Sequence, residues 1–193
     1  MNINQFPIVR TFSYAEYFAY CENLAAQNAN SGSNQTEALA NFTKLNVTRM
    51  KRVFKTFQPD TDVIKSLRGS SALQWFVITE SWCGDAAQSL PVFARLAEAL
   101  PEVKCTVVLR DENPELIDAF LTNGGRSIPK VLFTNETGEI IHHWGPRPQV
   151  LQQLFLKEHN AGIPHEQSVL MMQDWYNNDK GKHLTNEVAQ LLA

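Results

Sequence analysis

Hydrophobic residues in the middle of the chain gather in short runs, and each run has the character of a buried strand. Three runs cover residues 73–79, 103–109 and 130–133, and β-branched and aromatic residues dominate them. Short apolar runs of this kind are typical of strands that are covered on both faces. A fourth run, 139–144, follows the turn residues 135–138 (NETG), which predicts a hairpin between the last two strands.

Helical periodicity fills the spaces between these strands. Apolar residues recur three or four positions apart from Ala86 to Leu100, and Pro101 follows them. A second helix is expected from Pro114, because proline suits the first helical position. A third is expected over about 148–158. The predicted order is β-α-β-α-β-β-α, which indicates an α/β fold.

The two ends of the chain show helical patterns without strands. Ser13 and Glu16 have the spacing of a capping box that opens a helix. Residues 28–35 (NANSGSNQ) have the composition of turns and linkers, and we expect a mobile loop there. Another helix follows and stops before Pro59, and two short helical patterns occupy the tail after about His159.

Composition and charge narrow the class of protein. The chain has 193 residues, 44% of them hydrophobic and 19% charged, which is enough to form a core and argues against disorder. A net charge of -3 provides no general attraction for nucleic acid or an anionic membrane. The basic run 49–55 is interpreted as a solvated helix face.

Targeting signals and membrane segments are not expected. The first residues lack the pattern of a signal peptide, and no run reaches the roughly 18 apolar residues of a membrane span. We therefore expect a cytoplasmic protein whose partners are proteins or small molecules, with no role for nucleic acid or membrane.

The three cysteines, Cys21, Cys83 and Cys105, are far apart in sequence, which favours a reducing compartment over a disulfide framework. Cys83 comes where a buried strand turns into a helix. Unpaired amides and the helix dipole favour negative charge there, so we expect a lowered thiol pKa and a nucleophilic thiolate. The alternative is a cysteine that packs as a small hydrophobic residue, which is our interpretation of Cys105.

The sequence around Cys83 resembles the active-site motif W-C-G-x-C of the thioredoxin family. The matching residues are Trp82, Cys83, Gly84, Asp85 and Ala86. Pro91 stands at the place of the helix-kinking proline of the family. Residues 127–129 (SIP) match the loop whose cis proline, here Pro129, faces the cysteine, and Gly138 and Gly145 fit the hairpin and the end of the last strand.

The resemblance implies a thioredoxin-like fold with a mixed central sheet and helical extensions at both ends. It places an N-terminal extension at 1–72, the thioredoxin-like core at 73–159 and a C-terminal extension at 160–193, within one compact domain. With ESWCGDAAQ, the upstream segment 45–52 and the downstream segment 175–181, the pattern is similar to a bacterial branch of the family, here with a single cysteine in the motif. Some members of that branch carry a cysteine where this chain has Ala86. In the family, the residue before the cis proline, here Ile128, offers its backbone to an extended substrate.

Two departures from the family bear on the chemistry. Ala86 replaces the second cysteine, so Cys83 would form a mixed disulfide but need an external thiol reductant to clear it. Cys105 lies on the order of 13 Å away along a parallel strand, too far for a disulfide, whereas the position of Cys21 is open. Val77 replaces the buried aspartate of the family.

Other carboxylates lie near the motif in sequence. Glu80 or Asp85 would relay a proton or, as an anion, raise the thiol pKa, and the sequence leaves the net sign open. An equally supported interpretation of Asp85 is a first-turn acid that the helix dipole favours.

No metal or cofactor is expected. His142 and His143 are adjacent on a predicted strand and point to opposite faces, and no C-x-x-C pair exists.

These features lead to one hypothesis and one alternative. The hypothesis is a thiol-disulfide oxidoreductase in which Cys83 is the nucleophile and the amides of 84–86 stabilise its thiolate. Ile128 and Pro129 would position protein or low-molecular-weight disulfides. The alternative is a non-catalytic module that binds a partner on the same face, with Cys83 as a relic.

Overall fold

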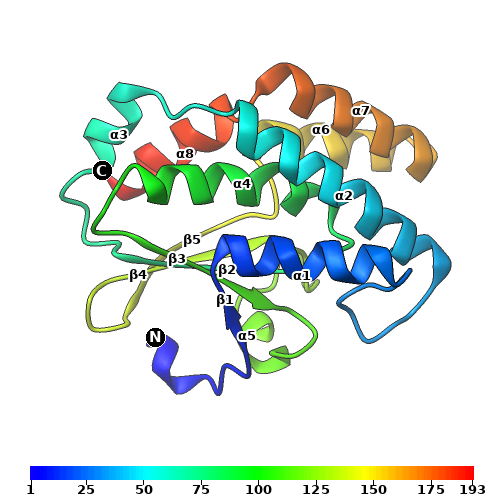
Figure 1. The fold of residues 1–193 in the computed structure, drawn as a ribbon. Coiled ribbons are helices and arrows are strands. Elements are labelled where there is room, and N and C mark those ends of the chain that lie inside the picture. The colour runs from blue at the N-terminus through cyan, green and yellow to red at the C-terminus, as the bar shows by residue number, and fades with distance from the viewer.

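One mixed sheet forms the centre of the computed structural model, which describes residues 1–193 except for the side chain of His165. The strand order across the sheet is β1-β3-β2-β4-β5 (Figure 1). The strands are β1 (Thr11–Phe12), β2 (Gln74–Thr79), β3 (Lys104–Leu109), β4 (Lys130–Thr134) and β5 (Ile140–Trp144).

β2 is the central strand of this sheet. It pairs in parallel with β3 and antiparallel with β4, and β5 returns antiparallel to β4 through the predicted hairpin. Val77 and Ile78 of β2 are fully buried, as expected for a strand with covered faces. The thioredoxin-like α/β fold with a mixed sheet and helical extensions is thereby confirmed.

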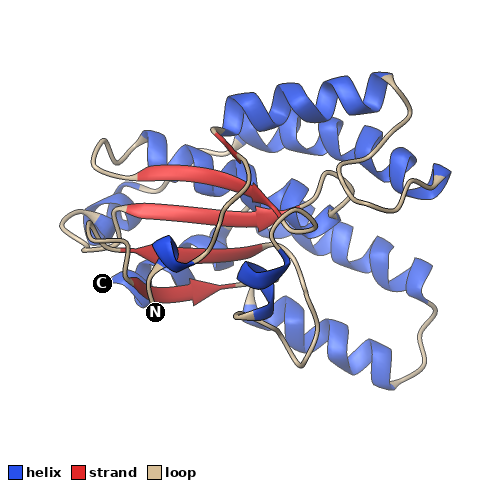
Figure 2. Cartoon of the chain, turned by 90° about the horizontal axis from the view of Figure 1, so that it is seen from below, coloured by secondary structure: helices blue, strands red, loops and turns tan.

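Helices cover the two faces of the sheet unequally. The helices are η1 (Ile3–Gln5), α1 (Tyr14–Ala26), α2 (Glu37–Thr56), α3 (Thr61–Leu67), α4 (Gly84–Glu98), α5 (Pro114–Asp118), α6 (Gln149–Asn160), α7 (His165–Asp179) and α8 (Lys182–Leu192). One face is covered by α1, α2, α3, α4 and α8 (Figure 1). The short η1 and α5 cross the other face, which Figure 2 shows from below.

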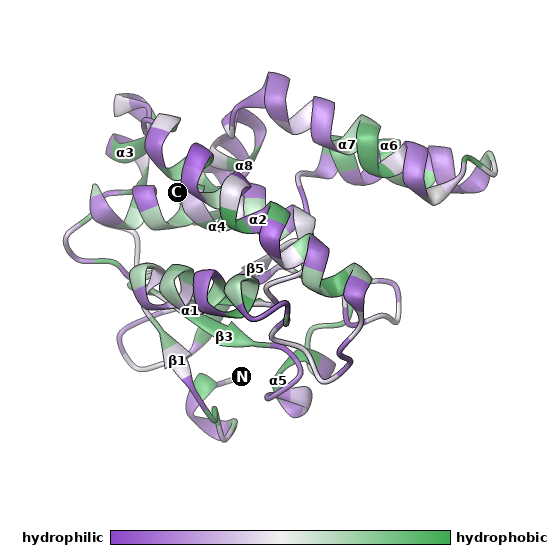
Figure 3. Ribbon diagram, turned by 45° about the vertical axis from the view of Figure 1, so that its right-hand side comes forward, coloured by the Kyte–Doolittle hydropathy of each residue, from purple (hydrophilic) through white to green (hydrophobic). Residues whose placement is uncertain are grey.

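The larger core lies between the sheet and α4 and is built on aromatic contacts. Phe93 of α4 is fully buried and meets Trp75 and Trp144 edge-on, with ring centroids 6.0 Å and 5.4 Å away. Phe133 completes the group at 5.6 Å from Trp75. Figure 3 shows apolar and polar residues interleaved along α2, as expected for a helix that packs one face on this core.

The capping box at the start of α1 is present, because the Ser13 side chain accepts from the Glu16 amide and Glu16 accepts from the Ser13 amide. Pro91 lies inside α4, where the resemblance places it. The tail forms α7 and α8 as predicted. None of the helices in the described part of the chain is both long and apolar enough to cross a membrane.

The N-terminal extension, for which the sequence predicts only helices, also contains a strand. Thr11 pairs with Val108, so β1 adds an edge strand to the sheet, and Asn2 forms a bridge with Glu139 of the hairpin. A strand of two residues is too short to produce a period-2 pattern. The helix α3 was also not predicted. The domain boundaries at 72 and 159 stay a prediction.

The loop over residues 28–35 is fastened, where a mobile loop was expected. Asn30 is 3% exposed and donates to the carbonyl of Asn34 at 3.0 Å. Gln35 donates to the carbonyl of Gly32 at 2.7 Å. The same polar side chains that mark a loop in sequence here close it on itself, because amide groups also satisfy backbone partners.

Removing the central aromatic ring tests this core. Phe93→Ala is expected to lower the free energy of unfolding by about 3–5 kcal/mol, because it leaves a cavity where three aromatic rings meet. Urea denaturation followed by circular dichroism measures the loss. Leu170→Ala, at a side chain that is 67% exposed, is the control and should change stability by less than about 0.5 kcal/mol. If Phe93→Ala changed the free energy of unfolding as little as Leu170→Ala, the assignment of Phe93 to the centre of the core would be contradicted.

Candidate functional site

Cys83 is the N-cap residue of α4, four residues after the end of the central strand β2. Its Sγ accepts the backbone N–H of Ala86 at 3.4 Å and donates to the carbonyl oxygen of Ile128 at 3.3 Å. The peptide bond between Ile128 and Pro129 is cis. The structure therefore brings the motif and the proline loop together, although they are 45 residues apart.

The loop of Pro129 is packed closely against the end of β5. Gly145, which follows β5, has φ of 113°, and a Cβ atom there would clash with the carbonyl oxygen of Pro129. Only glycine satisfies both conditions, since other residues rarely adopt this φ and none lacks a Cβ. This glycine thus allows the proline loop to reach the position opposite Cys83.

Burial and, to a smaller extent, the nearby Asp85 carboxylate raise the pKa of the Cys83 thiol to about 12. The amide of Ala86 and the guanidinium of Arg147 act in the opposite direction. The expected lowering by the helix N-terminus is therefore present but outweighed, because Cys83 is only 7% exposed. The prediction of a lowered thiol pKa was wrong for the resting protein.

Asp85 joins three parts of the chain. Its Oδ2 accepts from Arg147 Nη2 at 2.6 Å, and its Oδ1 accepts from the Tyr176 hydroxyl at 2.8 Å. Arg147 follows β5, and Tyr176 belongs to α7. The sign that the sequence left open is now set, because this carboxylate raises the thiol pKa of Cys83.

Sequence reasoning did not identify Arg147 and Tyr176 as parts of the site. They lie 62 and 91 residues from Asp85 in the chain. The only sequence signal was an arginine shortly after Gly145 and a tyrosine in a helical tail. Tyr176 stands in the segment 175–181 that the family resemblance includes, but no local pattern links either residue to Asp85, so only the folded chain brings them together.

Glu80, the other candidate carboxylate, binds the loop 28–35 and the segment after β3 rather than Cys83. It is 1% exposed, accepts the amide of Asp111 at 2.8 Å and also accepts the hydroxyl of Ser31. Burial raises its pKa, and these hydrogen bonds oppose the rise. Glu80 thus fastens the loop 28–35 to the end of β3. Both of its oxygens are engaged there.

Trp82 lies between this fastened loop and an arginine. The guanidinium of Arg110 lies 4.9 Å from the centre of its indole ring. A methyl group at Gly32 would lie 2.8 Å from its Nε1, so the loop approaches the indole closely. Trp82 therefore lines the site next to Cys83, and the loop 28–35 packs against its indole ring.

The other two cysteines lie away from Cys83. Cys105 pairs across the sheet with Trp75, at the opposite end of β2 from Cys83. Cys21 is fully buried in the core cluster on the α1 side of the sheet, whereas Cys83 belongs to the cluster on the other face. All three are free thiols. The position of Cys21, open in the sequence, is now assigned to the core.

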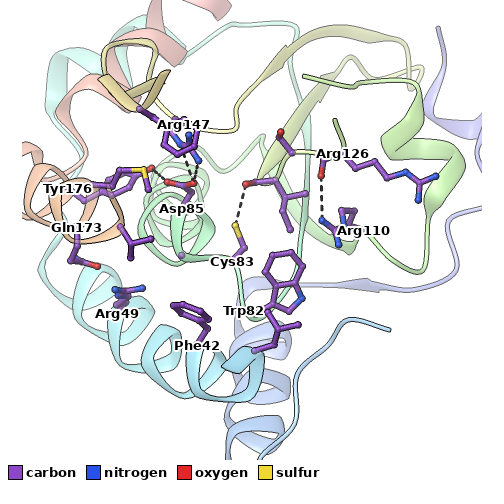
Figure 4. Close-up of a pocket in the computed structure, with 17 residues that line it drawn as sticks. Phe42, Arg49, Trp82, Cys83, Asp85, Arg110, Arg126, Arg147, Gln173 and Tyr176 are labelled. Atoms are coloured by element: carbon purple, nitrogen blue, oxygen red, sulfur yellow. Dashed lines mark hydrogen bonds and ion pairs between the residues drawn. The ribbon is translucent and has the colours of Figure 1, made fainter. Parts of the chain in front are cut away.

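A cavity of about 420 Å³ opens beside Cys83. Figure 4 shows Phe42 and Arg49 of α2 below the sulfur, Tyr176 and Gln173 of α7 on one side, and Arg110 and Arg126 on the other. Ile128 also lines it. The cavity therefore joins the thioredoxin-like motif to both extensions of the chain.

His142 and His143 lie on β5, paired with Phe133 and Leu132. Within the described part of the chain, no group of three or more histidine, cysteine or acidic side chains is placed to hold a metal ion.

Comparisons with known proteins agree with the fold. A family model described as Thioredoxin matches residues 32–162. No curated protein matches the chain. A solved protein of unknown function from Pseudomonas aeruginosa is 15% identical with a TM-score of 0.54, covering 93% of this chain and 96% of that one. An HIV epitope scaffold is 16% identical with a TM-score of 0.56, covering 93% and 97%. These two likenesses concern the fold alone.

Opposite substitutions around Asp85 should move the thiol pKa of Cys83 in opposite directions. Asp85→Asn removes a negative charge and is expected to lower it, whereas Arg147→Gln removes a positive charge and should raise it. Each pKa unit changes the thiolate fraction, and hence the alkylation rate at pH 8, about tenfold. The rate with iodoacetamide is measured by mass spectrometry of the Cys83 peptide.

A matched variant separates charge from packing. Tyr176→Phe deletes a hydrogen bond to the same carboxylate but keeps its charge, so it should not accelerate alkylation as Asp85→Asn does. Equal acceleration by both variants would mean that loosening α7, rather than the charge of Asp85, controls the thiol.

Proposed function

Since the chain belongs to the thioredoxin family, whose model matches residues 32–162, we propose that it exchanges thiols and disulfides through Cys83 alone. One observation carries this proposal: Sγ of Cys83 lies between the Ala86 amide and the Ile128 carbonyl, at the edge of a cavity. An amide donor at a helix N-terminus favours a thiolate when one forms.

The proposed reaction begins with loss of the Cys83 proton to solvent. The thiolate attacks one sulfur of a disulfide R–S–S–R, a new Cys83–S–S–R bond forms, and R–S⁻ leaves and takes up a proton. A second thiol then attacks the mixed disulfide and restores Cys83. This external thiol is required because Ala86 stands where a resolving cysteine would act.

The neighbouring residues have distinct roles in this proposal. The amides of 84–86 stabilise the thiolate, and Ile128 and Pro129 position the disulfide. Asp85 is a positioning residue, since Arg147 and Tyr176 engage both of its oxygens. We extend the proposal to protein or low-molecular-weight disulfides as substrates and to a cytoplasmic location in a bacterial cell.

The raised thiol pKa makes the proposed exchange slow and base-dependent at rest. A buried thiol that donates to the Ile128 carbonyl is protonated at neutral pH. The same observation favours a second function, a non-catalytic thioredoxin-fold module that binds a partner at this cavity. The two functions differ in whether the sulfur of Cys83 forms a covalent adduct.

Adduct formation separates the two functions. With 2-hydroxyethyl disulfide, the intact protein should form a mixed disulfide at Cys83, with a rate that rises about tenfold per pH unit between about pH 7 and 9, as the thiolate fraction does. Intact-mass spectrometry measures it, and Cys83→Ser is the control. A wild-type chain that forms no adduct across this range would favour the binding module.

Restoring the resolving thiol should convert single exchange into turnover. Ala86→Cys places a thiol one helical turn after Cys83, where the amide of residue 86 already contacts Sγ. We expect catalysis of disulfide reduction by dithiothreitol, absent in the size-matched Ala86→Ser. An inert Ala86→Cys with native circular dichroism would show that more than the resolving thiol is missing.

A further inference from the structure

The cavity beside Cys83 has the dimensions of a small-molecule site. Its volume of about 420 Å³ falls within the roughly 300–1,000 Å³ typical of ligand pockets. Cys83 and Ile128 are each 7% exposed, so the sulfur is reached through the cavity rather than from an open surface. The size and the burial both favour a small molecule over a folded protein as the occupant.

Positive charge dominates the lining of this cavity. Four arginines line it, against the single carboxylate of Asp85, in a chain whose net charge is -3. Three of these arginines form ion pairs. The pairs are Arg110 with Asp111, Arg126 with Asp118, and Arg147 with Asp85. The fourth, Arg49, makes no ion pair with any carboxylate that the structure describes.

Arg49 reaches from α2 to the start of α4. A methyl group at Gly84 would lie 3.4 Å from its Nη1, which puts the guanidinium beside the first turn of α4. Its one side-chain partner is the neutral Asn46, whose Oδ1 accepts from Nη1 at 3.1 Å. Burial lowers the pKa of Arg49 and Arg52 adds to this effect, whereas the Asp85 carboxylate opposes it. A half-buried cation that forms no ion pair with a described carboxylate, close to a helix N-terminus, is a suitable partner for an anion.

The rest of the lining is largely apolar and partly aromatic. Phe42 lies about two turns before Arg49 on α2. It lines the cavity, and its side chain is 38% exposed. Trp82 and Phe42 both lie below the sulfur of Cys83 in the view of Figure 4, and Phe155 and Met172 contribute from α6 and α7. Flat apolar groups stack well on such rings.

We propose that this cavity binds a small organic anion, with a carboxylate on Arg49 and a flat apolar body between Phe42 and Trp82. In this arrangement the body of the ligand lies next to Sγ of Cys83. The inference rests on the proposed function only in naming its substrates, which would be carboxylate-bearing thiols and disulfides. Binding itself requires no reaction at sulfur, so it is testable without exchange.

The test uses two probes of equal shape, 2-naphthoate and the uncharged 2-naphthamide. Their affinities are measured by calorimetry on the full chain carrying Cys83→Ser, which cannot exchange. Naphthoate should bind about tenfold or more tightly than naphthamide, since a hydrogen bond between two charged groups is stronger than one to a neutral amide. Adding Arg49→Gln should bring the ratio of affinities close to one.

Arg52→Gln is the matched control, because Arg52 lies on the same helix but is exposed and outside the cavity lining. It should keep the preference for naphthoate. Equal affinities for both probes, no binding at millimolar concentration, or a preference that survives Arg49→Gln would each overturn the inference. A chain that prefers naphthoate but forms no adduct with disulfides overturns the exchange proposal alone, and the reverse result overturns this inference alone.

Discussion

The ion pair between Asp85 and Arg147 is the contact on which the organisation of the site depends. Nη2 of Arg147 lies 2.6 Å from Oδ2 of Asp85, and both side chains are about nine-tenths buried. A buried charge without its partner is costly. Together with the Tyr176 hydroxyl, it ties the first turn of α4 to the segment after β5 and to α7. The same carboxylate influences the sulfur two residues before it, so the anchor of the C-terminal helices also contributes to the protonation of Cys83.

This arrangement differs from an exposed reactive cysteine in a consistent way. The strand-to-helix turn provides the amide of Ala86 as a donor to Sγ, yet Cys83 is only 7% exposed among the core residues on the η1 and α5 side of the sheet. Desolvation penalises the thiolate more than the amides of Ala86 and Asp85 and the guanidinium of Arg147 favour it. Enclosure thus lowers the reactivity of Cys83 at rest and, at the same time, creates a cavity with defined walls.

Both extensions contribute to that enclosure by different means. The N-terminal one supplies α2 with Phe42 and Arg49, and a loop that Glu80 fastens behind Trp82. The C-terminal one supplies α7, held through Tyr176. A cavity whose walls come from three separated parts of the sequence selects its ligand by the charge and shape of those walls, whereas the motif alone carries only the sulfur.

The sequence by itself determined the four longer strands and the helix after Cys83, because short apolar runs and capping residues are written in neighbouring positions. Its resemblance to the thioredoxin family implied the approach of the Pro129 loop. It did not reveal β1, since two residues carry no period, or the fastening of the loop 28–35, whose polar residues suit a free or a bound loop equally. The direction of the Cys83 pKa, the partners of Asp85 and the place of Arg49 in the cavity wall were decided by tertiary structure alone. Each depends on burial and on charges brought from distant positions, and neither quantity is local in the chain.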